Sequence, residues 1–294
     1  MLDTIDICIR SVEEAGYGPD RDRYTGLRPP LIMGILNVTP DSFYDGGSYP
    51  DLDSAVRRAV RMVEEGADLI DVGGESTRPF AEPVSISEEK DRVLPVIGEI
   101  RKRVDVPISI DTRHPDVAKD CVKEGASIIN DVSALSDPTM VDLVQKTETS
   151  AVIMHMKGDP RNMQESPYYD DPVEEVFGFL NDRVRDLNSR GIPRERLFVD
   201  PGIGFGKRTY DNLMIIENIG RFRETGCHVL VGASRKSFIG NVLFLEPGER
   251  YEGSIASALM AVERGASIVR VHDVAGTKRA LSLWNAFSRP ERYL

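Results

Sequence analysis

The chain has 294 residues, of which 40% are hydrophobic and 29% are charged, and its formal net charge is -11. This length can bury a large core, either as one barrel-type domain or as two smaller domains. The acidic balance would repel nucleic acids and anionic membranes, so a negatively charged substrate would need a local basic pocket.

The cysteines and the N-terminus indicate a cellular compartment. Cys8, Cys121 and Cys227 are too few and too widely spaced for a disulfide framework or a zinc cluster, and they fit inert packing residues. No apolar run approaches the roughly 18 residues of a membrane span. The chain begins with Asp3 and Asp6 where a signal peptide would be basic. The sequence therefore predicts a cytoplasmic protein with no membrane or nucleic-acid partner.

The chain divides at residue 30. Residues 1–30 form a predicted N-terminal extension, because their isoleucines fit a strand and a helix equally well and they end in a loop rich in Gly and Pro. Residues 31–294 repeat one unit: a short apolar run, a polar loop and a segment with helical periodicity. The apolar runs are residues 31–36, 68–73, 106–111, 126–131, 151–155, 197–200, 228–233 and 267–271.

Amphipathic segments separate these runs. Apolar residues recur at helical spacing in 53–65, and a capping pattern of Ser85 and Glu88 introduces a predicted helix over 86–103. Apolar strands that alternate with such helices indicate a parallel sheet, and eight units favour a closed (β/α)₈ TIM barrel in a single domain. A doubly wound open sheet is the alternative.

Three glycines support the repeat. Gly66, Gly125 and Gly265 each precede an alanine and then a strand, in the segments EEGADLIDV, KEGASIIND and ERGASIVRV. Each glycine is predicted to end a helix with a positive φ, which glycine adopts most readily. The longest loops are expected at residues 37–50, 74–85 and 156–170.

Polar side chains concentrate at the C-terminal ends of the predicted strands, where such barrels carry their sites. A barrel built only for stability would not need them. They are Asn37, Glu75, Ser76, Thr77, Arg78, Asp111, Asn130, Asp131, Asp200, Ser234, Arg235, Lys236, Ser237, Arg270 and His272.

One part of this set offers hydrogen-bond acceptors. Asp111, Asn130 and Asp200 would suit a flat heterocycle with several N–H donors, such as an aminopyrimidinone, because a carboxylate makes paired hydrogen bonds with an N–H and an adjacent amino group. The alternative interpretation is that Asp111 caps the third predicted helix and that Asp131 caps the turn that follows its strand.

The other part is basic. Lys236, Arg270 and His272 indicate an anion site, since the loops after the seventh and eighth strands of such barrels often hold phosphate. Arg270 and His272 are two residues apart and are therefore expected on one face of their strand. The alternative is a buried ion pair with a nearby acid such as Asp273.

The segment GIGFGK at 202–207 does not match the phosphate-loop pattern, because Pro201 and Arg208 stand where that pattern needs Gly and Ser or Thr. Its glycines are expected to turn the loop tightly beside a flat ligand. Phe205 could stack on that ligand or fill a gap. His155 is predicted to be a packing residue and no metal ligand.

Eight sequence blocks in order resemble the signature of the dihydropteroate synthases. They are LIMGILNVTPDSFYDGG at 31–47, ADLIDVGGESTRP at 67–79, ISIDTR at 108–113, IINDVS at 128–133, MHMKGDP at 154–160, FVDPGIGFGK at 198–207, SRKSFIG at 234–240 and RVHDV at 270–274.

The resemblance implies a pterin-binding (β/α)₈ barrel that joins hydroxymethyl-dihydropterin pyrophosphate to 4-aminobenzoate and releases pyrophosphate. It implies a homodimer, small-molecule substrates and Mg²⁺ as cofactor, with Asn37 as the metal ligand. It places Asn37, Asp45, Lys236, Arg270 and His272 in catalysis. The substrate-binding residues that it implies are Thr77, Arg78, Pro79, Asp111, Asn130, Met154, Asp200, Phe205, Lys236, Ser237, Arg270 and His272.

One position departs from the family pattern. Phe80 follows STRP where members commonly have Gly, so we expect catalysis to survive and the response to sulfonamides to shift. The alternatives for the whole chain are a pterin-binding methyltransferase-type barrel, a non-catalytic pterin-binding barrel, and an aldolase-type lyase in which Lys236 forms a Schiff base. Trapping with borohydride and a carbonyl substrate would detect the lyase.

Overall fold

The computed structural model describes residues 30–39, 52–75, 84–158, 163, 166–288 and 290. Within these residues the strands close into a parallel barrel in the order β1 to β8, as the sequence predicts, and the open-sheet alternative is wrong. The strands are β1 (Leu31–Asn37), β2 (Leu69–Gly73), β3 (Ile108–Asp111), β4 (Ile128–Asp131), β5 (Ser150–Met154), β6 (Leu197–Asp200), β7 (His228–Val231) and β8 (Ile268–Val271).

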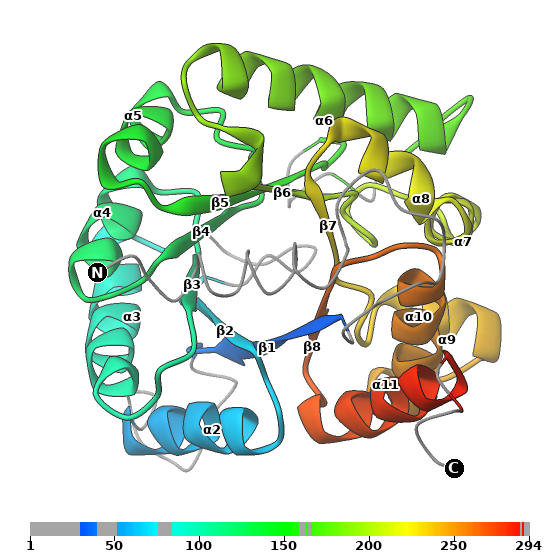
Figure 1. Ribbon diagram of the computed structural model, residues 1–294, viewed down its shortest axis with the longest axis horizontal. Coiled ribbons are helices and arrows are strands. Elements are labelled where there is room, and N and C mark those ends of the chain that lie inside the picture. Colours follow the sequence, from blue (N-terminus) through cyan, green and yellow to red (C-terminus); the bar gives the residue numbers. More distant parts are fainter. Residues whose placement is uncertain are drawn as a thin grey trace.

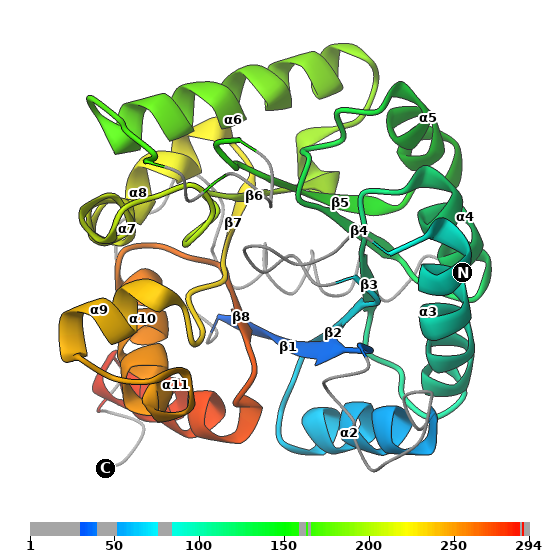
Figure 2. The same ribbon diagram turned by 180° about the vertical axis from the view of Figure 1, so that it is seen from behind.

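Helices surround the barrel in both views (Figures 1 and 2). They are α2 (Leu52–Glu64), α3 (Ile86–Arg101), α4 (Pro115–Lys123), α5 (Pro138–Thr147), α6 (Pro172–Ser189), α7 (Thr209–Glu217), α8 (Ile219–Phe222), α9 (Ser237–Leu243), α10 (Tyr251–Glu263) and α11 (Val274–Ser288). The predicted bounds differ from these by one or two residues at most ends of elements, because hydrophobicity marks burial and not the last hydrogen bond of an element.

The predicted helix boundaries have a physical basis. The Ser85 side chain accepts a hydrogen bond from the backbone N–H of Glu88 at 3.2 Å, which confirms the cap of α3. Gly66, Gly125 and Gly265 have φ of 103°, 110° and 111°, as the repeat predicts. Each lets the chain leave its helix and enter the next strand without strain.

The interior of the barrel contains a layer of apolar side chains, which we call the floor. Inward-facing positions alternate along each strand, so every strand except β3 contributes one large side chain to this layer. The floor consists of Met33, Leu69, Ile128, Val152, Phe198, Leu230 and Ile268, with Leu31 packed against it. Burying one such side chain contributes roughly 1.5–3 kcal/mol, so the floor stabilises the closed barrel.

Several expectations fall on residues outside the described ranges. The N-terminal extension is one of them, apart from residue 30, and so are most of the three long loops. The same holds for Asp45, Thr77, Arg78, Pro79 and Phe80, whose predicted roles therefore remain predictions.

Candidate functional site

The inward-facing positions nearer the C-terminal ends of the strands are mostly polar, and we call this layer the mouth. It begins two residues beyond the floor on several strands: Leu69 is followed by Asp71, Ile128 by Asn130, and Ile268 by Arg270. Its members include Asn37, Asp71, Asp111, Asn130, Met154, Asp200 and Arg270, together with the apolar Ile35, which is in register with Asp71. The inward-facing side chains of these strands therefore change from apolar to polar or charged within two residues.

Arg270 is the centre of the mouth. Its Nε lies 2.6 Å from Asp71 Oδ2, and its Nη2 lies 2.7 Å from Asp111 Oδ2. The same Asp71 oxygen accepts a hydrogen bond from Asn130 Nδ2 at 3.1 Å. Four side chains from β2, β3, β4 and β8 therefore form one connected network across the mouth.

Two expectations about Asp111 and Arg270 need correction. Arg270 is paired with buried acids, as one alternative proposed, but the partners are Asp71 and Asp111 and not Asp273. Asp273 instead binds Arg235 at 2.9 Å. Asp111 is held by Arg270 and does not cap a helix in the structure, so its capping alternative is wrong.

Sequence reasoning missed Asp71, although its side chain is fully buried in the network. It lies in the continuous apolar run LIDVG, which hid it among strand residues. The strand alternation could have found it, because Asp71 shares its face with Leu69 and Gly73. An acid at an inward position of a buried strand needs a partner, which here is Arg270.

Burial and the charge network shift several pKa values. Burial raises the pKa of Asp111 to about 7, although Arg270 opposes this change. Burial also raises the pKa of Asp200, whereas the N–H of Gly202 and the charge of Lys236 lower it. Burial alone would lower the pKa of Arg270, but Asp71 and Asp111 raise it above its ordinary value. Arg270 is therefore cationic at every physiological pH.

Two glycines, Gly73 and Gly232, lie between the polar side chains of the mouth. A Cβ at Gly73 would lie 3.5 Å from Asp111 Cβ and 3.8 Å from Asn37 Oδ1. A Cβ at Gly232 would lie 3.8 Å from Arg270 Cβ and 4.0 Å from Asp200 Oδ2. A side chain at either position would take space between the predicted site residues.

Lys236 enters this region from the N-cap of α9. Its Nζ lies 3.8 Å from the centroid of the Phe205 ring, a cation–π arrangement. Burial lowers the pKa of Lys236 to about 8, and the charge of Arg270 adds to this effect. The ammonium is therefore protonated at pH 7 but can lose its proton within a moderate pH range.

His272 is not a cation in the structure. Its Nδ1 lies 3.0 Å from Ser234 Oγ, and burial together with Arg270 lowers the pKa of the imidazole to about 3. The predicted anion site therefore has Lys236 and Arg270 as its charged members. His272 can contribute only a neutral hydrogen-bonding ring.

The loop after β6 turns tightly, as its glycines predict. Gly202, Gly204 and Gly206 have φ of 69°, 83° and 61°. The N–H of Gly202 donates to Asp200 Oδ1 at 2.7 Å, and a Cβ at Gly204 would lie 2.9 Å from Lys236 Cδ. The loop can therefore approach both Asp200 and Lys236 only because these residues are glycines.

Other predicted residues lie around this centre. Met154 is 4% exposed at the end of β5, where it pairs in register with Asp200. Ser237 is exposed at the start of α9, next to Lys236. Asp131 lies outside the network, since it accepts hydrogen bonds from Ser133 and from the N–H of Leu135, as its capping alternative predicts.

The described residues are compatible with a magnesium ion that binds together with a phosphate-bearing substrate. The described residues contain no group of three or more His, Cys, Asp or Glu side chains that could hold a metal ion. Mg²⁺ commonly uses one or two protein oxygens together with water and substrate phosphates, so it does not need such a group. The amide oxygen of Asn37, which faces Asp111 across Gly73, suits that role.

Comparisons with known proteins agree with this geometry. Residues 33–272 match the family model described as pterin binding enzyme. A dihydropteroate synthase of Haemophilus influenzae is 46% identical over 88% of this chain and 94% of its own length. A Xanthomonas albilineans dihydropteroate synthase with 4-aminobenzoic acid has a TM-score of 0.84 at 46% identity, over 89% of this chain and 94% of its own. A Yersinia pestis dihydropteroate synthase in a sulfonamide drug complex has a TM-score of 0.84 at 42% identity, over 90% and 98%.

Proposed function

The chain belongs to the dihydropteroate synthases, the pterin-binding enzymes of folate biosynthesis, and we propose that the mouth of its barrel carries out their reaction as follows. The chain is a transferase that joins hydroxymethyl-dihydropterin pyrophosphate to 4-aminobenzoate and releases pyrophosphate. The assignment of residues rests on one observation. Asp111, Asn130 and Asp200 lie in the same mouth as two cations, Lys236 and Arg270.

The pterin lies against the acidic part of the mouth. Asp111 and Asp200 accept hydrogen bonds from its ring N–H and amino groups, and the Asn130 amide can both donate and accept. Asn130 is already oriented by Asp71, so it loses little freedom when the ring binds. Met154 packs against the ring, and the Lys236 ammonium donates to its acceptor atoms.

The pyrophosphate lies toward the basic part. Arg270 and the neutral imidazole of His272 donate hydrogen bonds to phosphate oxygens, together with Thr77 and Arg78. Arg270 reaches the mouth from β8 with its guanidinium already fixed by two carboxylates, so the donors do not have to reorganise during the reaction. Asn37 would hold magnesium, which would supply positive charge to offset the charge of the leaving pyrophosphate.

The reaction begins when the bond between the pterin methylene carbon and the phosphate oxygen breaks. Both electrons leave with the pyrophosphate, and a positive charge spreads from the methylene into the pterin ring. Asp111 and Asp200 stabilise that cation from fixed positions in a region sheltered from water. The nitrogen of the arylamine then attacks the methylene carbon, and its proton passes to the released pyrophosphate. The enzyme supplies no covalent nucleophile, so Lys236 acts as a donor and not as a Schiff base.

The family resemblance implies that Pro79, Phe205 and Ser237 frame the arylamine, and that Asp45, in the segment 37–50, takes part in catalysis. A sulfonamide would compete at the same place, since it resembles the arylamine in shape. Phe80→Gly should therefore retain turnover and change the concentration of sulfonamide that halves the rate. Unchanged inhibition would contradict a role of Phe80 in this subsite.

The direct test follows both products. The purified protein is mixed with hydroxymethyl-dihydropterin pyrophosphate, 4-aminobenzoate and magnesium. Pyrophosphate release is recorded over time, and the mass of the pterin product is determined by mass spectrometry. We expect a product that contains both rings and requires magnesium. Pterin binding without coupling would instead favour the non-catalytic alternative.

A homodimer is the assembly that we propose. Exposed apolar side chains gather on the neighbouring helices α7, α9 and α10, which lie on one side of the barrel (Figure 1). Phe244, at the end of α9, is 93% exposed. An exposed apolar patch that contains such a large aromatic side chain is typical of a protein–protein interface. The others are Tyr210, Leu213, Val242, Leu243, Tyr251 and Met260.

Analytical ultracentrifugation tests this assembly. Phe244→Asp should shift the sedimentation from dimer to monomer, because it places a charge in an apolar interface. Ile86→Asp is the matched control: Ile86 is 41% exposed on α3, on the opposite side of the barrel in both views. A monomeric parent protein, or equal effects of the two variants, would contradict the proposed interface.

The cytoplasm is the location that we propose. Cys121 and Cys227 are free and buried in the core, and burial raises the pKa of both thiols. Such thiols behave as inert packing residues and fit a reducing compartment. None of the helices in the described part of the chain is long and apolar enough to cross a membrane.

A further inference from the structure

Lys207 is a buried lysine for which the reaction has no evident use. Only 3% of the residue is exposed, and burial lowers the pKa of its ammonium to about 7. Its Nζ lies 2.9 Å from His155 Nδ1, 3.3 Å from the His155 carbonyl oxygen and 3.0 Å from the Phe205 carbonyl oxygen. All three contacts are with neutral acceptors, and an ammonium has three N–H donors to match them.

These acceptors come from two different chain segments beside the mouth. His155 follows β5 directly, whereas Phe205 lies in the loop after β6. The segments touch so closely that a Cβ at Gly202 would overlap the His155 carbonyl oxygen. Lys207 therefore fastens the loop after β6 to the end of β5 from inside the protein.

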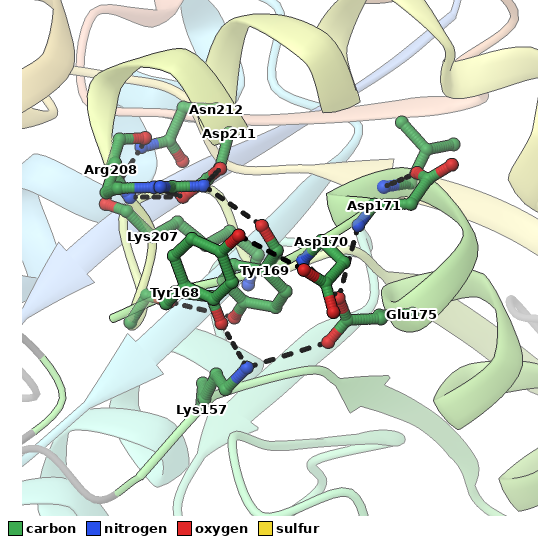
Figure 3. Close-up of polar contacts among 12 residues, drawn as sticks. Lys157, Tyr168, Tyr169, Asp170, Asp171, Glu175, Lys207, Arg208, Asp211 and Asn212 are labelled. Atoms are coloured by element: carbon green, nitrogen blue, oxygen red, sulfur yellow. Dashed lines mark hydrogen bonds and ion pairs between the residues drawn. The ribbon is translucent and has the colours of Figure 1, made fainter. Parts of the chain in front are cut away.

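A second group of side chains binds the same loop (Figure 3). Asn212 Oδ1 accepts from the N–H of Gly204 at 2.7 Å, and the Tyr169 hydroxyl donates to the Gly206 carbonyl at 2.8 Å. Arg208 binds Asp211, which is fully buried, at 2.8 Å and the Tyr169 carbonyl at 3.2 Å. These contacts hold the glycines on both sides of Phe205, while the carbonyl of Phe205 itself is bound by Lys207.

Phe205 is the point where this loop meets the reacting groups. Its ring lies under the Lys236 ammonium at 3.8 Å, and the loop begins at Gly202, whose N–H binds Asp200. Rotation of the Phe205 carbonyl would move the ring away from Lys236. A shift of about 1 Å in a site of this kind can lower the rate roughly a hundredfold.

We propose that Lys207 is a positioning residue of this enzyme, which holds the Phe205 backbone so that the Phe205 ring and the Lys236 ammonium stay where the pterin and the arylamine meet. Lys207 does not touch the substrates and acts only through Phe205. The ionisable groups around it are Asp200 in the mouth, Lys236 before α9, Asp211 in α7, Lys157 after β5, and His155, which is neutral because burial lowers its pKa to about 3.

The first test is Lys207→Met, which keeps most of the apolar stem and removes the three donors. The expected result is a fall in kcat/KM for the arylamine of about tenfold to a hundredfold, with a higher KM and the same circular dichroism spectrum. Lys146→Met is the control, because Lys146 is an exposed lysine on α5 whose ion pair is with Asp142, away from this loop. This control substitution should change kcat/KM for the arylamine by less than about twofold.

A double-mutant cycle separates positioning from general stability. In a Phe205→Leu background, Lys207→Met should alter the arylamine kcat/KM by less than about twofold, because the group through which it acts is gone. Independent, multiplying effects of the two substitutions would overturn the proposal. So would a lower melting temperature with unchanged kinetic constants.

Lys207→Gln covers the case in which the methionine variant does not fold. Its amide has two N–H donors in place of three, so an intermediate loss of kcat/KM is expected, again suppressed by Phe205→Leu. Wild-type constants in a folded Lys207→Gln protein would overturn the proposal.

Discussion

The floor and the mouth of the barrel interior are built on the same strands but obey different physical rules. The floor consists of apolar side chains that pack at almost no exposure, with Leu230 and Val152 fully buried. The mouth places Asp71 and Asp111 against Arg270, although burying charges costs free energy unless they are paired. A stable barrel needs only the first arrangement, so the second one indicates function.

The largest effect should come from Arg270→Met. This change leaves Asp71 and Asp111 buried without their cation, which costs about 3–5 kcal/mol of unfolding free energy, and it removes the proposed donor to the pyrophosphate. Turnover should be nearly lost, as measured by pyrophosphate release, and the urea midpoint should fall. Arg235→Met is the control, since the half-exposed Arg235 binds Asp273 at the surface and should contribute only about 0–1 kcal/mol. An active Arg270→Met enzyme would disprove the assignment of the mouth.

Leu230→Ala should separate the two layers. It creates a cavity in the floor and should lower the free energy of unfolding by about 2–5 kcal/mol, measured by urea denaturation. The kcat/KM of the folded fraction should stay within about threefold of the wild type, because substitutions at distant sites act almost independently. A large loss of catalysis in the folded fraction would mean that the floor also shapes the site.

Asp71→Asn should have a smaller effect that is centred on catalysis. The amide keeps the shape of the side chain but loses the charge that fixes Arg270 and orients Asn130. We expect kcat/KM for the pterin substrate to fall about tenfold to a hundredfold, since a perturbed charged hydrogen bond costs roughly 1.5–3 kcal/mol. Wild-type kinetics in Asp71→Asn would show that Arg270 is held well enough by Asp111 alone.

The smallest effect should appear in the pH dependence. Burial lowers the pKa of Lys236 to about 8, so the ammonium is present below pH 8 and lost as the pH rises through that value. Pterin affinity, measured by fluorescence quenching, should therefore fall roughly tenfold between pH 7 and pH 9. Lys236→Met should bind more weakly at pH 7 and should lack this alkaline decrease. A decrease that persists in Lys236→Met would assign the titration to another group, and Lys207→Met would then test Lys207.

Much of the mouth could be predicted because strand ends of a parallel barrel meet at one edge. Asp111, Asn130, Asp200 and Arg270 each end or nearly end a strand, and strand order alone brings them together. Asp71 escaped prediction because a single acid within an apolar run gives no periodic signal. Lys207 escaped because its partners are two backbone carbonyls and an imidazole, and no motif in the sequence encodes such a set.

By itself, the sequence determined the barrel, its strands in order and the edge at which the polar side chains collect, since hydrophobic periodicity and helix-ending glycines are local signals. Only the tertiary structure decided how the charges are shared. Arg270 could have faced a ligand alone or Asp273, and it binds Asp71 and Asp111; His272 could have been a cation, and burial beside Arg270 keeps it neutral. Pairing and protonation depend on which groups from distant strands meet and on how far water is excluded, and neither can be read along the chain.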